Sequence, residues 1–568
     1  MNGFIVTLST DGSPLPGQYC WKPLFNFQQE HRSKKYVRPG VMAGQFTSDR
    51  FHRHKFFEET EAGLLITEGL ITNVEVLYKK HHCSTAGRLI YKLIKTGSLQ
   101  ELHGNFAGVY YDHATQKLTA FNNHTGTQKV YYFRSDSYTV VATDLKVLTT
   151  TLRSLGITLA PDYDAVEMLL SYGFMLEDYT FVTQIRQLTA GQLLHANKER
   201  LQLDRYFELG TIERKQCSKE QFIEQLEQQF QQAVHEEYAL DEAYGYTSLA
   251  TLSGGLDSRM TTLVAHKAGY QQELINFSHK GYADEVIARQ IARHYQLRLS
   301  TVELSAESLT AIDDVVRVND GMTLYSGASH VFQALRQLRL LNSGIVHTGM
   351  LGDAIMGSYL SAPFDTLPKS SSGAYSNRIS NRSEQLFNTI VSRYRTEELF
   401  KFYNRAFQGI NTGYQYLYLV GESLSPFMHP DFIQLALSIP REYMYKERLY
   451  IDWMRKKHPQ EAAFCWENIG GKPTNNDVMR RLYRFKRAVI KRLPVVTMWK
   501  NSMTPEQSWY ENSEKVRKVL DTYYYDHYAH SVIDSHLQKQ LNLLYSQRDF
   551  TSKAQVLTVL AAFKSLFP

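Results

Sequence analysis

Cysteine is scarce in this chain of 568 residues. The four that it has, Cys20, Cys83, Cys217 and Cys465, lie far apart, and no two of them have C-x-x-C spacing. Disulfide-rich domains and cysteine zinc sites both need closely spaced cysteines. The sequence therefore predicts neither a disulfide framework nor a zinc site.

Long apolar runs and a strong net charge are also absent. No stretch reaches the run of about 18 apolar residues that a transmembrane helix needs, and the first residues, MNGFIVTLST, lack the basic and apolar regions of a signal peptide. A formal net charge of +6 is too weak to indicate nucleic acid or membrane partners. With 43% hydrophobic and 21% charged residues, the composition predicts a soluble, cytoplasmic protein of two to four domains.

The N-terminal part, to about residue 205, has the pattern of a β-rich region. Short runs of β-branched and aromatic residues alternate with polar turns, as in GLLITEGLI (63–71), FAGVYYD (106–112), KLTAFNN (117–123), KVYYF (129–133) and YTVVATD (138–144). Residues 74–97 and 161–174 instead have helical spacing. We expect antiparallel sheets with a few helices.

The pattern changes near residue 210. Residues 218–238 have helical spacing with Ser218 as the N-cap. After them, strand-like and helix-like segments alternate: 248–253, 258–270, 273–278, 283–296 and 300–305. This alternation predicts a doubly wound parallel sheet, and beyond about residue 380 the chain is mostly helical.

The segment SLATLSGGLDSRMTTLVA (248–265) reads as a strand, a glycine-rich turn and a helix. Gly254 and Gly255 let backbone N–H groups approach an anion, while Ser253 and Ser258 add hydroxyl donors at a helix N-terminus. Asp257 would repel phosphate unless a Mg²⁺ ion lies between them. The alternative is an ordinary glycine-rich turn with an aspartate N-cap.

SGGLDS matches the pyrophosphate-binding loop of the PP-loop ATP pyrophosphatases, which cleave ATP to AMP and pyrophosphate. Residues 283–304, TGMLGDAIMGSYL (348–360) and SPFMHPDFIQLALSIP (425–440) resemble segments of the asparagine synthetases. Residues 102–133 and VATDLKVL (141–148) resemble the class II glutamine amidotransferase domain of the same enzymes. The resemblance covers essentially the whole chain.

The resemblance implies an α/β protein with two domains. Residues 1–208 would form an Ntn-type αββα glutaminase-like domain. Residues 209–568 would form a PP-loop synthetase domain, similar to the adenine nucleotide alpha hydrolases, with a parallel sheet and a helical C-terminal part. It also implies an AMP-forming ATP-dependent ligase that adenylates a carboxylate and transfers it to an amine or ammonia.

The first half departs from the family at three positions. Asn2 stands where the family has its cysteine nucleophile, and Cys20 is too distant to replace it. Glu68-Gly69 replaces an Asn-Gly pair that stabilises the oxyanion, where a carboxylate would be repulsive. Asn122-Asn123 replaces an Arg-Asp pair. We therefore expect this half not to hydrolyse glutamine, and to be structural or to bind a partner.

In the second half, the resemblance implies that Ser253–Ser258 hold the ATP phosphates and that Asp257 and Asp353 bind Mg²⁺. It further places Gly349 beside the phosphates and the backbone of Phe277 and Ser278 beside adenine. Lys472, in CWENIGGKPTN, is the candidate for the family's catalytic lysine, or else a solvated residue. Arg259 would face either the phosphates or solvent.

Met350 replaces the catalytic glutamate of the family. A carboxylate from elsewhere, Glu384 or Asp320, could substitute for it, although each could equally be a surface or capping residue. The resemblance leaves several functions open: an asparagine synthetase-like ligase using ammonia or a separate glutaminase, an intramolecular amide cyclase like the lasso-peptide cyclases and β-lactam synthetases, amidation of a polysaccharide precursor, or a non-catalytic nucleotide-binding protein. A homodimer is compatible with all of them.

Residues 478–492 form a basic segment with an apolar stripe of Val478, Leu482, Phe485 and Val489. Such a helix can bind an acidic peptide, RNA or a membrane surface. We favour the alternative that the stripe packs against the protein and the basic face is solvated.

Overall fold

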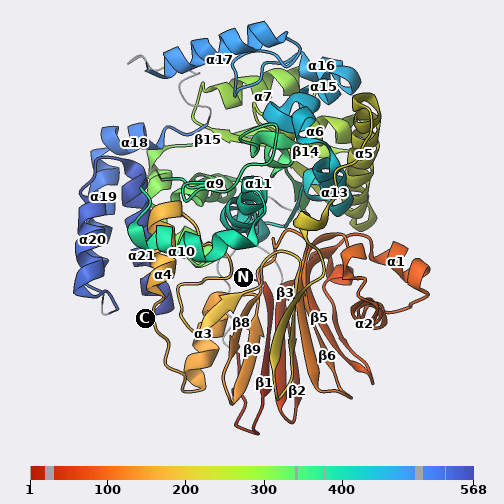
Figure 1. Cartoon of the computed structure of the whole chain (residues 1–568), viewed down its shortest axis with the longest axis vertical. Coiled ribbons are helices and arrows are strands. Elements are labelled where there is room, and N and C mark those ends of the chain that lie inside the picture. The colour runs from red at the N-terminus through yellow and green to blue at the C-terminus, as the bar shows by residue number, and fades with distance from the viewer. Residues whose placement is uncertain (1, 20–30, 339–342, 377, 493–502, 531) are drawn as a thin grey trace.

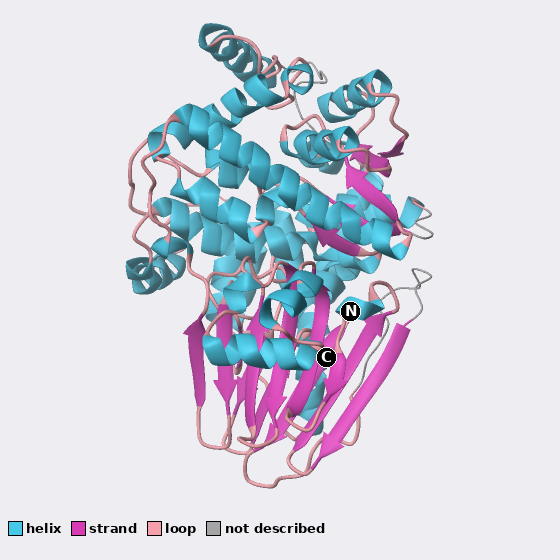
Figure 2. Ribbon diagram, turned by 90° about the vertical axis from the view of Figure 1, so that its right-hand side faces the viewer, coloured by secondary structure: helices cyan, strands magenta, loops and turns pink. Residues whose placement is uncertain are grey.

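The computed structural model describes residues 2–19, 31–338, 343–376, 378–492, 503–530 and 532–568 (Figure 1). An antiparallel β-sandwich lies at one end of the molecule and a largely helical region around a parallel sheet at the other (Figure 2). None of the helices in these ranges is long and apolar enough to cross a membrane.

Two six-stranded antiparallel sheets form the sandwich. The first sheet has the order β10 (Ile185–Gln187), β8 (Tyr131–Arg134), β9 (Tyr138–Ala142), β1 (Gly3–Ser9), β3 (Val41–Ser48) and β2 (His31–Arg38). The second has the order β12 (Leu201–Arg205), β11 (Gln192–Ala196), β7 (Lys117–Asn122), β6 (Gly104–Asp112), β5 (Gly63–Ile71) and β4 (Phe57–Glu59).

Helices cover the outer face of each sheet. In β1, Phe4 and Val6 point between the sheets, whereas Ile5 points outward to α3 (Leu145–Ser154) and α4 (Tyr163–Tyr172). The helices α1 (Val74–His81) and α2 (Ala86–Thr96) cover the second sheet. This order of layers confirms the predicted αββα arrangement. The predicted helical segment 74–97 is two helices because His82 adopts a left-handed conformation and Thr85 caps the second helix.

A five-stranded parallel sheet organises the second half. Its order is β15 (Leu299–Glu303), β14 (Gln272–Ser278), β13 (Thr247–Thr251), β16 (Ser343–His347) and β17 (Glu422–Leu424). One face packs on α6 (Asp257–Lys267) and α7 (Ala283–His294), and the other on α8 (Ile312–Asn319) and α9 (Ser326–Gln337). The long helix α5 (Lys219–Tyr244) begins at Ser218, whose side chain forms the predicted cap. The doubly wound parallel sheet is confirmed, but the three residues of β17 were too few to be recognised in a helical region.

The C-terminal part is helical, as predicted. Its helices are α10 (Asn381–Ile390), α11 (Glu397–Phe400), α12 (Asn411–Gly413), α13 (Pro430–Ser438), α14 (Arg441–Met444), α15 (Arg448–Lys457), α16 (Pro459–Ala462), α17 (Asp477–Arg492), α18 (Glu506–Asn512), α19 (Glu514–His527), α20 (Ser535–Tyr545) and α21 (Phe550–Leu566). The last helix, α21, packs against both α4 (Figure 1) and α8, which lie in different predicted domains. The two halves therefore share a hydrophobic core, and the boundary at residues 208 and 209 stays a prediction.

The preferred interpretation of the basic helix is wrong. The stripe residues of α17 are exposed, with exposed fractions of 65% for Val478, 58% for Leu482, 70% for Phe485 and 43% for Val489. The helix lies at the edge of the molecule (Figure 1). Its stripe has helical periodicity, but that periodicity does not tell which other segment, if any, covers it.

Candidate active site

The SGGLDS loop joins the carboxyl end of β13 to α6. Its two serines are hydrogen-bonded to each other, with the hydroxyl oxygens 2.7 Å apart. The Ser258 hydroxyl also accepts a bond from the Ser253 N–H at 3.0 Å, and the Ser253 hydroxyl accepts one from the Gly255 N–H at 3.1 Å. These bonds curl the loop at the N-terminus of α6. The first backbone N–H groups of a helix have no acceptor within the helix itself.

The loop after β16 packs directly on the SGGLDS loop. A Cβ atom on Gly349 would lie 2.3 Å from the backbone nitrogen of Ser258, and one on Gly352 would lie 2.6 Å from Cγ of Asp257. Only glycine permits so close an approach. The approach lets the Asp353 N–H donate to Oδ2 of Asp257 at 3.0 Å, which brings the two aspartates predicted to bind metal side by side.

A cavity of about 360 Å³ opens at this edge of the sheet, within the usual range for small-molecule sites. Seven of the predicted site residues line it: Ser253, Gly255, Asp257, Ser258, Phe277, Gly349 and Asp353. Among the described residues, Gly254, Ser278 and Lys472 do not line it. Within the loop, Gly254 donates its N–H to Asp284. Ser278 is buried, and its hydroxyl donates to the backbone carbonyl of His279.

Asp257 lies in an environment that disfavours its negative charge. Burial of the carboxyl and the neighbouring Asp353 carboxylate raise its pKa well above the usual value. The Tyr450 hydroxyl interacts with this carboxylate and opposes the rise. The Asp257 and Asp353 carboxylates, side by side, are a donor set suited to a hard cation such as Mg²⁺.

The cavity is acidic. Besides the two aspartates, it is lined by Asp284 and Glu467, and no lysine or arginine stands among its described lining residues. Asp284 accepts bonds from the Gly254 N–H and the Asn276 amide, both at 2.9 Å, and burial raises its pKa to about 7. The sequence does contain a signal for Asp284. This residue lies in the first turn of a helix that follows a strand of the same sheet.

Neither carboxylate considered as a substitute for the missing family glutamate reaches the cavity. Met350 lines the cavity at the substituted position. Glu384 is exposed on α10, and Asp320 is buried beside the Tyr131 hydroxyl at 3.4 Å. Within the described residues, the additional carboxylate of the C-terminal region that lines the cavity is Glu467.

Arg259 faces neither the phosphates nor solvent, so both alternatives for it were wrong. Its side chain is fully buried and donates to four backbone carbonyls, those of Gly254 (3.2 Å), Glu461 (3.1 Å), Phe464 (3.4 Å) and Cys465 (2.6 Å). It therefore fastens the segment after α16 to the SGGLDS loop. A single sequence gives no sign of this contact because the partners are about 200 residues away.

The same contact places Glu467 rather than Lys472 at the cavity. The Glu467 N–H donates to the Gly254 carbonyl at 3.1 Å, and a Cβ atom on Gly254 would come within 2.9 Å of the Glu467 Cβ atom. Lys472 is exposed. Its catalytic role stays a prediction that the geometry does not favour.

In the sandwich, side chains at the positions that depart from the glutaminase pattern make contacts with neighbouring groups of the protein. Glu68 on β5 lies 3.4 Å from the buried Lys55 ammonium group. The Asn123 amide donates to Asn105 and Thr125, and its carbonyl oxygen accepts from the Thr127 N–H. These side chains are held in the interior by neighbouring groups, which is consistent with a half that no longer hydrolyses glutamine.

Comparison with known proteins gives two family matches. Residues 225–409 match the asparagine synthase family, and residues 75–207 match the glutamine amidotransferase domain. No curated protein sequence matches the chain.

Two solved structures are similar only distantly. Glutamine phosphoribosylpyrophosphate (PRPP) amidotransferase from B. subtilis, complexed with ADP and GMP, is 13% identical over 61% of this chain and 81% of that one, with a TM-score of 0.25. The allosteric regulatory enzyme of purine biosynthesis is 13% identical over 72% of this chain and 88% of that one, with a TM-score of 0.24. Neither carries weight at these scores.

The assignment thus depends on the two family matches and on the folds of the regions that they cover. The amidotransferase match falls on the αββα sandwich, and the synthase match includes four of the five strands of the parallel sheet. The two matches confirm the predicted resemblance of the chain to the asparagine synthetase family over residues 75–207 and 225–409.

Proposed function

We propose that the chain is an ATP-dependent carbon–nitrogen ligase that forms AMP and pyrophosphate. The observation that carries the proposal is the cavity formed by the SGGLDS loop and the Asp257–Asp353 pair at the carboxyl edge of the parallel sheet. Ligands of open α/β sheets bind at this edge. In this proposal, as in the sequence prediction, residues 209–568 carry the ligase site and residues 1–208 form a domain without glutaminase activity.

In the proposed reaction, a substrate carboxylate oxygen attacks the α-phosphorus of ATP, and the bond to the bridging oxygen breaks to release pyrophosphate. An amine nitrogen then attacks the acyl carbon, the bond to AMP breaks, and the nitrogen loses a proton. Ser253, Gly255 and Ser258 would position the phosphates, and Phe277 would lie beside the adenine. Mg²⁺ bound by Asp257 and Asp353 would neutralise phosphate charge, which the acidic cavity cannot do by itself.

The proposal is tested by pyrophosphate release from ATP and Mg²⁺ by the purified chain. Aspartate with ammonium, aspartate with glutamine, and no added substrate are compared. We expect pyrophosphate release to need a carboxylate substrate. We expect the amide product to form with ammonium but not with glutamine, because Asn2 and Glu68 replace the glutaminase residues. Synthesis with glutamine as donor would show that the first half is active, and failure to bind ATP with Mg²⁺ would overturn the ligase assignment.

A second candidate is closure of an amide within one molecule, as in the lasso-peptide cyclases and β-lactam synthetases. Met350, in place of the family glutamate, favours it because a methionine cannot position free ammonia. A carboxylate and an amine carried by one substrate would show this function as formation of a cyclic amide with no separate amine added.

Glu467 is the proposed acceptor of the amine proton. Replacing Glu467 by glutamine should lower the rate of amide formation by about 10²- to 10⁴-fold, the usual contribution of a general base. The carboxylate-dependent exchange of pyrophosphate with ATP, which reports the first step, should persist. The two rates, measured on the same preparation, separate loss of the base from loss of the fold.

Lys472→Gln tests the catalytic role predicted for Lys472, which belongs to the same segment but is exposed. We expect both rates to stay within about twofold of the original protein. A loss of both steps in this variant would instead support the catalytic role predicted for Lys472 from the sequence.

A further inference from the structure

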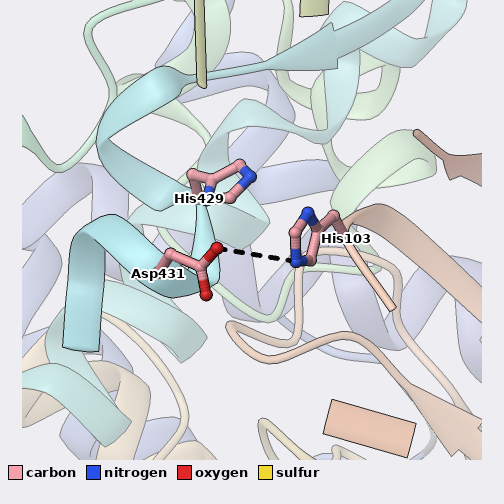
Figure 3. A group of neighbouring side chains, drawn as sticks. All are labelled: His103, His429 and Asp431. Atoms are coloured by element: carbon pink, nitrogen blue, oxygen red, sulfur yellow. Dashed lines mark ion pairs between the residues drawn. The ribbon is translucent and has the colours of Figure 1, made fainter. Parts of the chain in front are cut away.

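A cluster of two histidines and two acids lies where the two halves meet. His103 precedes β6 of the sandwich, Glu236 lies on α5, and His429 and Asp431 lie at the start of α13. Figure 3 shows the imidazole rings and the Asp431 carboxylate directed toward one another. The cluster is outside the ATP cavity described above.

Glu236 orients both imidazoles. Its Oε2 atom accepts from Nδ1 of His103 at 3.1 Å and from Nε2 of His429 at 3.4 Å, while Thr72 donates to its other oxygen. A carboxylate can only accept these bonds, so the two nitrogens carry the protons. The other nitrogens, Nε2 of His103 and Nδ1 of His429, make neither of these bonds, and a metal ion would displace any proton that they carry.

One of these nitrogens has no protein partner. Nδ1 of His429 is buried and makes no hydrogen bond within the described residues, although the side chain is only 4% exposed. Burying a polar atom without a partner is costly. A metal ion would give this nitrogen a partner, which makes the atom an independent indication of a ligand.

The third ligand is Asp431. Its Oδ2 atom lies 3.9 Å from Nε2 of His103, and one ligand atom from each of His103, His429 and Asp431 lies within 4.8 Å of the others. Zinc ligands lie about 2.0–2.2 Å from the ion, and so about 3.3 Å from one another. The Asp431 side chain is 42% exposed, so it can move the short distance required.

We propose that His103, His429 and Asp431 bind one divalent transition-metal ion, with Zn²⁺ the best suited, which fastens the sandwich to the ligase half. Two imidazoles and a carboxylate are a usual zinc set, and the fourth position would hold water. Glu236 would act as the carboxylate behind the histidine ligands, an arrangement that raises their basicity and fixes their orientation. The cysteines gave no sign of this site because it contains none.

The test is zinc binding by the purified full chain after removal of metal with a chelator, measured by titration calorimetry and by metal analysis. We expect one tightly bound Zn²⁺ per chain and a rise in the thermal unfolding midpoint on adding zinc. His429→Gln should weaken binding at least about 100-fold, and Glu236→Gln about 10- to 100-fold. Asp431→Asn should also weaken zinc binding. Because Asp431 is half-exposed, this substitution separates loss of a ligand from a folding defect.

His458→Gln is the matched control. His458 is also buried and hydrogen-bonded to a glutamate, Glu227 at 2.8 Å, but Lys267 lies 3.4 Å from its other ring nitrogen. This variant should bind zinc as the original chain does. Absence of a tight site, or binding that Asp431→Asn and His429→Gln leave unchanged, would overturn the proposal and leave the cluster as a hydrogen-bonded contact.

Discussion

Replacing Asp257 by asparagine should abolish pyrophosphate release while making the protein more stable in the absence of nucleotide and metal. We expect a loss of at least about 10³-fold in rate, or about 4 kcal/mol of transition-state stabilisation. The reason is that Asp257 is a proposed metal ligand and also supplies the oxygen that accepts the Asp353 N–H. Initial rates with saturating ATP and Mg²⁺ measure the loss.

The gain in stability follows from the direction of the pKa shift. Because burial and Asp353 raise the pKa of Asp257 above its usual 3.8, the folded state holds a proton that the unfolded chain releases. Stability from this group is fully present below about pH 3.8 and is lost as pH rises toward the raised pKa. As pH rises above about 3.8 the fold therefore loses stability through this group, and a neutral amide of the same shape avoids that loss.

The difference in thermal unfolding midpoint between the variant and the original protein should thus be near zero at about pH 4 and grow as pH rises. Added Mg²⁺ should stabilise only the original protein. Asp204→Asn, at an exposed position on β12, is the control and should change neither rate nor midpoint. A variant that is less stable at neutral pH would show that the carboxylate is compensated within the protein itself.

The sequence was sufficient for the parts of the site that depend on local structure. A strand, a glycine-rich turn and a helix necessarily bring Ser253, Asp257 and Ser258 to the edge of a parallel sheet, and Asp353 follows the neighbouring strand in the same way. Both aspartates were therefore predictable in place, although their metal-binding role stays a proposal.

The parts that depend on contact between distant segments were not predictable. Arg259 looked like a surface or phosphate-binding residue, yet it is buried against carbonyls of the segment around Phe464. That same packing decides that Glu467 faces the cavity and Lys472 does not. The prediction that the α17 stripe packs against the protein was wrong for a related reason, since periodicity identifies an apolar face but not what covers it.

Replacing Lys55 by methionine should produce the largest loss of stability of the substitutions considered. Lys55 is buried between Glu422 of β17, at 2.6 Å, and Glu68 of β5, at 3.4 Å, and so joins the parallel sheet to the sandwich. Removing the cation that pairs with both Glu68 and Glu422 leaves these buried carboxylates without it, which costs about 3–5 kcal/mol. Urea denaturation followed by tryptophan fluorescence measures the loss.

Glu68→Gln should behave in the opposite way. Burial, together with the Glu422 carboxylate, raises the pKa of Glu68 to about 7, although Lys55 lowers it. Its contribution to stability is present below the usual 4.5 and is lost as pH rises through about 7. At about pH 8 the amide should therefore be neutral or stabilising, because Lys55 keeps its shorter bond to Glu422. A loss equal to that of Lys55→Met would contradict this account.

This pair of results bears on why the first half would not act as a glutaminase. The family's oxyanion-stabilising asparagine is replaced by a glutamate that lies 3.4 Å from a buried lysine at the junction between the halves. The substitution Glu68→Asn restores the family residue at this position. On its own it should alter the junction without creating glutamine hydrolysis, since Asn2 still supplies no nucleophile. Ammonia release from glutamine by this variant, measured against the original protein, should stay at background. A measurable rate would mean that the substituted pocket still binds and activates glutamine.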